Sequence, residues 1–344
     1  MRVLVIGGTG LIGTGITQEL VESGYDVTVY NRGRTEARLP HSVELVEGDR
    51  TDHAEFETTM TGIDVDVVID MDISYGSPAD VESSLRAFRG QVDHYIFCSS
   101  VAVYRQPDAP VPLTEDAPRK SAGERYGQRK VACETRLMEA YRTDEFPVTI
   151  IRPGHTYGDG GPANGGLSYS LGFWETAFID RLRKGKPIVV HGDGSALWGF
   201  CHRDDVARTF VTAAGDPNTI GEAYHVANPD PLTWDSYIRH VAAAVDAPAP
   251  SLIHIPSQVL MDILPEDRNQ FPSTEWHYSW VFDVSKAQHE LEFEVTVPLQ
   301  TGIERTVAWL DERDRIEDSD AQSLDDTIID AWEAAEAAFT SVLE

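Results

Sequence analysis

The sequence predicts an α/β protein built on a doubly wound parallel sheet, with a smaller lobe towards the C-terminus. Apolar runs of strand length alternate with segments of helix length through the first half of the 344-residue chain, which is the pattern of a parallel sheet. Several runs are uninterrupted Val and Ile, as expected for strands that helices cover on both faces. The expected strands are 3–6, 27–30, 43–46, 65–69, 94–98 and 148–151.

The second half of the chain predicts the smaller lobe. A glycine-rich stretch over 154–172 predicts a long loop that shapes a substrate pocket. The expected helices of this half are 174–183, 204–214, 234–245 and 325–343. We expect a sheet domain over 1–153, with segments around 187–228 rejoining it, a substrate-binding lobe mainly over 154–310, and an acidic helical extension over 311–344.

The charge balance is strongly acidic. The chain carries 57 acidic and 28 basic residues, a net charge of -29, which repels phosphate backbones and anionic lipid surfaces. We therefore expect neither nucleic acid nor a membrane as partner. Only five of the basic residues are lysines, and this composition favours a halophilic host, with simple acidic solubility as the alternative.

The sequence lacks the marks of membrane insertion, secretion and metal binding. Its longest apolar runs, such as 65–69, are far shorter than the roughly 20 residues that span a bilayer. The chain passes from Met1 directly into a strand without a secretory signal, so we expect a cytoplasmic protein. Three scattered cysteines suggest neither a disulfide framework nor a metal site.

A glycine-rich turn lies between the first expected strand and the first expected helix. The run GGTGLIG over 7–13 satisfies the dinucleotide-binding pattern, because glycines allow a tight turn and a close approach of backbone N–H groups to a pyrophosphate. A strand-to-helix turn without a ligand is the alternative. The sequence thus predicts a Rossmann fold that binds its cofactor at Gly7, Gly10, Leu11, Ile12 and Gly13.

The residues after the second and third strands bear on the choice of cofactor. NAD-binding proteins of this fold place a carboxylate at the end of the second strand, where this chain has Asn31 followed by Arg32 and, two positions on, Arg34. A guanidinium can grip a 2′-phosphate, so NADP is favoured over NAD, with solvated loop charges as the alternative. Asp49 and Arg50 follow the third strand, where a carboxylate commonly meets the adenine amino group; an ordinary turn is the alternative.

Two later motifs complete a family pattern. The chain reads CSSVAVY over 98–104 and YGQRK over 126–130, followed by RP at 152–153, YG at 157–158, GDG at 192–194, DVA at 205–207 and DVSKA at 283–287. With these motifs in this order, the chain resembles the extended short-chain dehydrogenase/reductases, the NAD(P)-dependent epimerase/dehydratase family, over residues 1 to about 310.

The resemblance implies a catalytic set. Tyr126 and Lys130 lie one helical turn apart, and a nearby ammonium favours the phenolate of a tyrosine. By resemblance, Tyr126 removes the substrate hydroxyl proton while hydride passes to the nicotinamide, Ser100 hydrogen-bonds the same oxygen, and Lys130 also holds the nicotinamide ribose. The matching serine is Ser100, four residues before Tyr104, whereas Ser99 supports the turn. By the same resemblance, Pro153 and His155 border the cofactor, with a structural loop residue as the alternative for His155.

Departures from the family narrow the activity. The 4,6-dehydratases place an Asp-Glu pair where this chain has Val101 and Ala102, which disfavours water elimination. Sugar-nucleotide enzymes usually place an arginine at the position of Trp198, so the substrate is not expected to be a nucleotide sugar. Trp198 offers a flat face to a sugar ring or is a core aromatic, and Tyr157 borders the substrate or is a structural loop residue.

Three activities follow, in decreasing order of preference. The first is an NAD(P)-dependent oxidoreductase acting on a hydroxyl or ketone of a sugar, sugar acid or polyol. The second is a sugar epimerase that holds its cofactor tightly, which the sequence does not separate from the first. The third is a non-catalytic dinucleotide-binding or RNA-associated relative. A homodimer through helices that include 126–141 is compatible with each.

Overall fold

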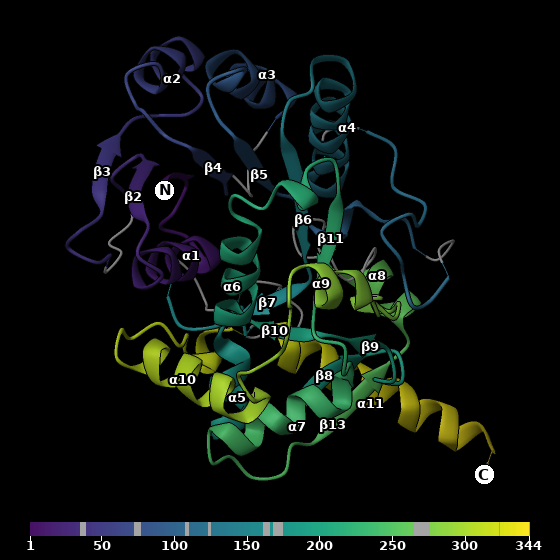
Figure 1. The fold of residues 1–344 in the computed structure, drawn as a ribbon. Coiled ribbons are helices and arrows are strands. Elements are labelled where there is room, and N and C mark those ends of the chain that lie inside the picture. Colours follow the sequence, from purple (N-terminus) through teal and green to yellow (C-terminus); the bar gives the residue numbers. More distant parts are fainter. Residues whose placement is uncertain are drawn as a thin grey trace.

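A seven-stranded parallel sheet forms the centre of the protein, in the order β11-β6-β5-β4-β1-β2-β3 (Figure 1). The computed structural model describes residues 1–34, 39–71, 77–106, 110–122, 125–160, 166–167, 175–264, 276–322 and 324–343. The predicted doubly wound α/β fold is confirmed. The strands of this sheet are β1 (Arg2–Ile6), β2 (Asp26–Asn31), β3 (Glu44–Glu47), β4 (Val67–Asp70), β5 (His94–Cys98), β6 (Val148–Pro153) and β11 (Ala223–Val226).

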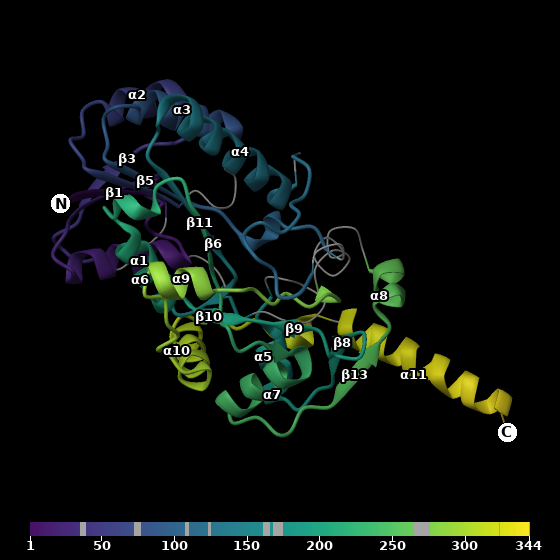
Figure 2. The same ribbon diagram turned by 45° about the vertical axis from the view of Figure 1, so that its right-hand side comes forward.

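Helices cover both faces of the sheet, as the uninterrupted apolar strands predict (Figures 1 and 2). Alternate residues of β1 supply two separate cores: Val3 and Val5 pack with one helix layer, and Leu4 and Ile6 pack with the other. The first layer contains α1 (Leu11–Glu22) and α6 (Arg203–Ala213); the second contains α2 (His53–Met60), α3 (Pro78–Phe88) and α4 (Tyr126–Asp144).

The smaller lobe lies at the end of the sheet where β6 leads into β7 (Figure 1). Three short strand pairs build it: β7 (His155–Tyr157) with β10 (Phe200–His202), β9 (Leu197–Trp198) with β12 (Leu232–Thr233), and β8 (Ile188–His191) with β13 (Leu252–Ile255). Its helices are α5 (Ala177–Arg183), α7 (Trp234–Ala244), α8 (Ser257–Ile263) and α10 (Leu299–Asp311), whereas α9 (Ser285–Glu290) packs on β11 of the central sheet.

The chain crosses between sheet domain and lobe more than once. Within the segment 187–228, α6 packs on α1 and β11 joins the sheet, whereas β8 pairs with β13 outside it. The expected long loop over 154–172 contains strand β7; residues 161–165 and 168–172 of it lie outside the described part of the chain.

The last helix, α11 (Leu324–Leu343), packs on the lobe through its first half only. Ile328 and Ile329 enter a small core with Val189, Ile255 and Leu260. Beyond this contact the helix extends away from the body (Figure 2), and Phe339 is 78% exposed.

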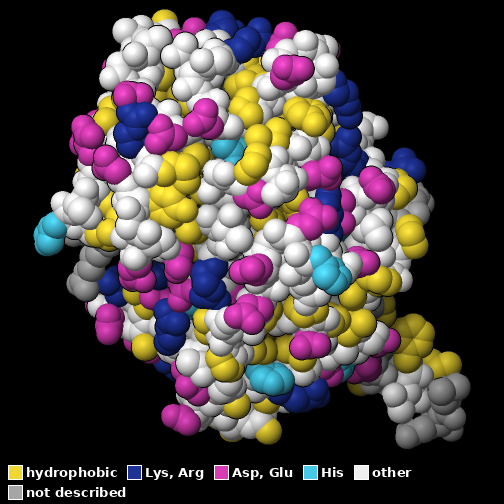
Figure 3. Space-filling view, viewed as in Figure 1, with side chains coloured by type: hydrophobic (Ala, Val, Ile, Leu, Met, Phe, Trp, Pro, Cys, Tyr) yellow, Lys and Arg dark blue, Asp and Glu magenta, His cyan; other side chains and the backbone are white. Residues whose placement is uncertain are grey.

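The surface mixes acidic, basic and apolar side chains on the face drawn in Figure 3. Among the described residues, no helix has the length and apolar character to cross a bilayer. Within the same part of the chain, no group of three or more His, Cys, Asp or Glu side chains is placed to hold a metal ion. The three cysteines are buried and unbridged.

Candidate active site

The glycine turn joins β1 to α1 at the carboxyl ends of the parallel strands. Gly7 has a φ of +82°, which favours glycine, and a Cβ on Gly13 would lie 2.9 Å from the Gly7 carbonyl oxygen. No side chain caps α1 at Gly10, and a Cβ there would meet no protein atom within 4 Å. The start of α1 therefore has open space beside Gly10 and first-turn N–H groups without a side-chain cap, as binding of a phosphate group would need.

Residues from β2 and β3 meet beside this turn. The side-chain oxygen of Asn31 accepts the N–H of Gly33 at 2.7 Å. The backbone N–H and hydroxyl of Thr51 lower the pKa of Asp49, and the charges of the exposed Arg32 and Arg34 add to this effect. The structure thus brings the predicted residues Asn31, Arg32 and Asp49 to one end of the β2–β3 pair.

Arg50, which follows Asp49, directs its side chain into the protein. Its side chain is 7% exposed, and its Nη1 lies 2.7 Å from the Asp70 carboxylate while its Nη2 donates to the Ser84 hydroxyl at 2.7 Å. The guanidinium also lies over the ring of Phe56. This side chain joins β4 to the layer of α2 and α3, because a buried guanidinium needs a carboxylate partner. The contact of Arg50 with a cofactor stays a prediction.

The predicted catalytic residues meet at the end of β5. Ser100 accepts the N–H of Ala102 at 3.1 Å and hydrogen-bonds Tyr126. The Nζ of Lys130, 1% exposed, donates to the Cys98 carbonyl at 2.9 Å. Gly127 allows this assembly, because a Cβ there would lie 2.1 Å from the Ala102 carbonyl oxygen. The close approach of α4 to the Ser100 turn therefore requires glycine.

Burial dominates the electrostatics at Tyr126. Burial raises the pKa of the phenol well above its ordinary value, and the hydrogen bond from Ser100 opposes the rise. Burial also raises the pKa of the neighbouring Cys98 thiol, and the charge of Lys130 opposes that rise. The phenol is therefore protonated at neutral pH in this arrangement.

His155 and Trp198 lie side by side, with ring centroids 5.9 Å apart. The His155 Nε2 lies 2.9 Å from the Gly166 carbonyl oxygen, and burial lowers the pKa of the imidazole. Trp198 is 9% exposed, donates its Nε1–H to the Tyr278 carbonyl at 3.2 Å, and packs on Trp234. Most of the Trp198 side chain is therefore buried in the core, which favours the core alternative.

Tyr157 also belongs to the core. It is 1% exposed, and its hydroxyl donates to the Leu299 carbonyl at 3.4 Å. A Cβ on Gly302 of α10 would lie 2.4 Å from that hydroxyl. This packing under α10 favours the structural alternative for Tyr157, and its contact with substrate stays a prediction. Pro153 is buried at the end of β6, beside Val226 of β11.

Sequence reasoning missed a buried carboxylate behind the catalytic set. Glu134 is fully buried and accepts hydrogen bonds from Ser99, Arg119 and Arg152. Burial raises the pKa of this carboxyl, but Arg152 outweighs it and the pKa lies below its usual range. The available signal was the spacing, because Glu134 lies one helical turn beyond Lys130.

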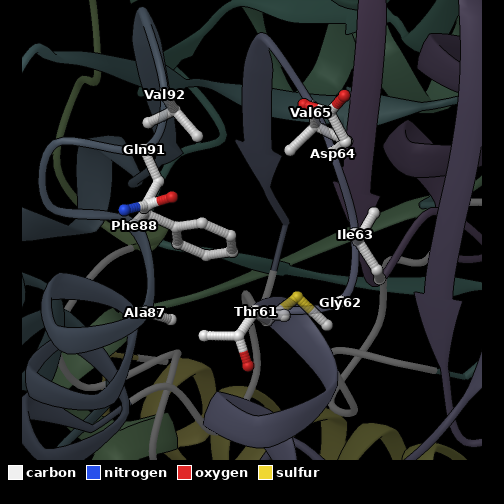
Figure 4. A pocket seen from close by; sticks show the side chains of 10 residues that line it. Thr61, Gly62, Ile63, Asp64, Val65, Ala87, Phe88, Gln91 and Val92 are labelled. Carbon is white, nitrogen blue, oxygen red and sulfur yellow. The ribbon is translucent and has the colours of Figure 1, made fainter.

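A surface pocket lies at the opposite edge of the sheet (Figure 4). Its lining comes from residues 60–65, which end α2 and lead into β4, and from Ala87, Phe88, Gln91 and Val92, which precede β5. Because these residues stand at the amino ends of the strands, the pocket is separate from the catalytic set at their carboxyl ends.

Comparisons with known proteins agree with the geometry. Residues 3–227 match the model of the NAD dependent epimerase/dehydratase family. The chain is 28% identical over 284 residues to 2'-dehydrokanamycin reductase of Streptomyces kanamyceticus, covering 83% of this chain and 77% of that protein. It is 26% identical over 316 residues to the chloroplast stem-loop binding protein of 41 kDa b of Arabidopsis thaliana, covering 88% and 77%.

A solved structure shares the fold. Epimerase Mth375 from Methanothermobacter thermautotrophicus superposes with a TM-score of 0.74 at 19% identity, covering 91% of this chain and 92% of that one. The family match confirms the resemblance and the enzyme class predicted from the motifs. The chain therefore belongs to the NAD-dependent epimerase/dehydratase family.

Proposed function

We propose that this protein is a reductase that converts a ketone of a sugar, sugar acid or polyol into a hydroxyl with a nicotinamide cofactor. The hydrogen-bonded pair of Ser100 and Tyr126, with Lys130 buried behind it, carries the proposal. The similarity to 2'-dehydrokanamycin reductase supports the direction of reaction. The substrate is proposed to lack a nucleotide, because Trp198 stands where a diphosphate would need an arginine.

The protonated form of the buried Tyr126 phenol is the form that reduction requires. A protonated phenol can donate its proton to the ketone oxygen, and Ser100 can donate a hydrogen bond to the same oxygen. A bound reduced nicotinamide would supply the hydride for the new C–H bond. Lys130 holds the end of β5 through the Cys98 carbonyl and is proposed to bind the nicotinamide ribose.

Substitution at the catalytic set tests the proposal. Ketone and hydroxyl forms of sugars and sugar acids, with and without a nucleotide, are screened with both cofactors by following the absorbance of the reduced cofactor. On a substrate so found, Tyr126→Phe should reduce kcat by about 100-fold or more, whereas Tyr141→Phe on the same helix should leave it unchanged. Full turnover by Tyr126→Phe would refute the assignment.

The same screen separates the other two activities. An epimerase would convert the sugar without a net change in cofactor absorbance. Binding of a stem-loop RNA without turnover would favour the non-catalytic alternative, which the similarity to the chloroplast protein raises. The net charge of -29 opposes that binding.

NADP is proposed as the preferred cofactor. Gly7, Gly10 and Gly13 would hold the pyrophosphate at the start of α1, and the exposed Arg32 and Arg34 would meet a 2′-phosphate. Replacing both arginines by serine should weaken NADP binding by about tenfold or more and leave NAD binding unchanged. Arg142→Ser, at an exposed site on α4, is the control. Equal loss for both cofactors would contradict the preference.

A further inference from the structure

A chain of buried polar side chains ties together the segments behind Ser100. Glu134 of α4 receives the Ser99 hydroxyl at 2.5 Å and two guanidinium N–H groups of Arg152, from β6, at 2.9 and 2.8 Å. Arg119 donates to the same carboxylate at 2.7 Å. All four acceptor positions of the carboxylate are therefore used.

This series of hydrogen-bonded side chains continues from Arg152 to His225 on the neighbouring strand β11. The Nη1 of Arg152 donates to the Tyr104 hydroxyl at 2.5 Å, which lies 2.5 Å from the Nε2 of His225 on β11. The His225 Nδ1 faces the Asp283 carbonyl at 3.1 Å and must donate to it. The Nε2 of the neutral ring then accepts from Tyr104. Burial lowers the pKa of His225 to about 4, which keeps the ring neutral.

These bonds hold the backbone on both sides of Ser100. On one side, the Ser99 N–H donates to the Ile151 carbonyl at 2.7 Å and its hydroxyl donates to Glu134. On the other side, the Tyr104 N–H donates to the Val101 carbonyl and its hydroxyl joins Arg152 to His225. Ser100 itself has an extended backbone between these two anchors.

We propose that Glu134 is a positioning residue, which acts through Ser99 and Arg152 to fix the orientation in which Ser100 meets Tyr126. This inference rests on the proposed roles of Ser100 and Tyr126. A carboxylate can accept all four donors, whereas the amide of Glu134→Gln must turn its NH2 towards Arg152 in either orientation. The variant therefore keeps the side-chain volume and disrupts the hydrogen bonds.

The test follows the 13C NMR chemical shift of the tyrosine Cζ, which responds to hydrogen bonding of the attached hydroxyl. The protein is labelled with [13Cζ]tyrosine, and the Tyr126 and Tyr104 signals are assigned by their loss in Tyr126→Phe and Tyr104→Phe. Ser100→Ala removes the hydrogen bond to Tyr126 and gives a reference displacement of the Tyr126 signal. Glu134→Gln and Ser99→Ala should each displace the Tyr126 signal in the same direction, by at least half of that reference.

A second buried carboxylate provides the matched control. Asp205 of α6 is 1% exposed and accepts the N–H and hydroxyl of Thr296 at 3.1 and 2.9 Å, as well as a bond from Arg208. Asp205→Asn should lower the midpoint of thermal unfolding without moving the Tyr126 signal. If Glu134→Gln does not fold, Ser99→Ala carries the test.

Several results would overturn the proposal. The first is a Tyr126 signal that stays in place in the folded Glu134→Gln and Ser99→Ala variants. The second is a Tyr126 signal that moves by the same amount in Asp205→Asn, and the third is a Tyr126 signal that does not move in Ser100→Ala. The measurement needs no substrate. Failure of the sugar screen would therefore reject the proposed function while leaving this result to stand, and an unmoved signal in an active enzyme would reject only the positioning role.

Discussion

Buried histidines show how much a single side chain can contribute to the pH dependence of stability. The Gly215 N–H donates to the His94 Nδ1 at 3.2 Å, so the neutral ring must donate through Nε2 to the Thr149 hydroxyl at 2.7 Å. Thr149 in turn donates to the Thr219 carbonyl. Burial lowers the pKa of His94 to about 4, because this arrangement accommodates only the neutral ring.

We predict that His94 destabilises the fold as the pH falls. The unfolded chain binds this proton near pH 6.5 and the folded chain near pH 4. Stability is therefore complete above about pH 6.5 and decreases towards pH 4, by up to about 3 kcal/mol. Urea unfolding at constant KCl should show a flatter pH dependence for His94→Gln. The exposed His41→Gln should behave as the parent, and an unchanged slope in His94→Gln would contradict the prediction.

Residues defined by local pattern were easier to predict than residues defined by packing. The motif spacing anticipated Ser100, Tyr126 and Lys130, and the structure places them together. The buried contacts of Arg50 and Tyr157 could not be read from the sequence, because their partners, Asp70 and α10, are distant along the chain. A polar side chain next to a motif does not reveal which buried group it meets.

At the scale of elements, the β1–α1 turn uses glycine for two different reasons, packing within the protein and room for a ligand. Gly13 is needed for packing, since a Cβ would lie 2.9 Å from both the Gly7 carbonyl and the Gly8 Cα. Gly10 has an ordinary extended backbone, and a Cβ added there would meet no protein atom within 4 Å. Only a ligand that approaches the start of α1 would require glycine at position 10.

The two alanine variants should therefore behave differently. Gly13→Ala should lose about 1 to 2 kcal/mol of unfolding free energy, because the overlap with backbone exceeds the gain in helix propensity. Gly10→Ala should keep its stability within about 1 kcal/mol and lose cofactor affinity by about tenfold or more. Thermal unfolding and cofactor titration measure the two effects. Full cofactor affinity in Gly10→Ala would remove the reason for placing the pyrophosphate there.

Most elements of the sheet could be predicted because their signal is continuous in sequence. The expected strands over 3–6, 94–98 and 148–151 fall within β1, β5 and β6. The pairing of β8 with β13 rather than with the sheet could not be read from β8, because its apolar run Ile-Val-Val suits any buried strand. Pairing depends on the rest of the fold.

At the scale of the whole molecule, the net charge of -29 sets the response to salt. Repulsion among surface carboxylates destabilises the folded state, and added salt screens it. We predict that the thermal unfolding midpoint rises as KCl is increased from about 0.1 M to about 1 M. An equally stable protein in dilute buffer would contradict the halophilic interpretation of the composition.

The C-terminal helix divides into a packed half and an exposed half. Removing residues 333–344 should leave the unfolding midpoint unchanged, because the side chains described from Glu333 to Val342 are exposed. Removing the whole of α11 should cost about 3 kcal/mol or more, since it uncovers the core around Val189 and Leu260. Equal stability of the two truncated proteins would show that the contact of Ile328 and Ile329 contributes nothing.

The position of β11 has a consequence for synthesis of the chain. All residues of β6 are buried, and β11 is the strand that covers its outer side. A nascent chain leaving the ribosome therefore exposes β6 as an open, apolar sheet edge until residue 226 has emerged. Chaperone capture should be greatest in that interval, and cutting the gene after residue 153 should give an aggregating fragment rather than a free cofactor domain.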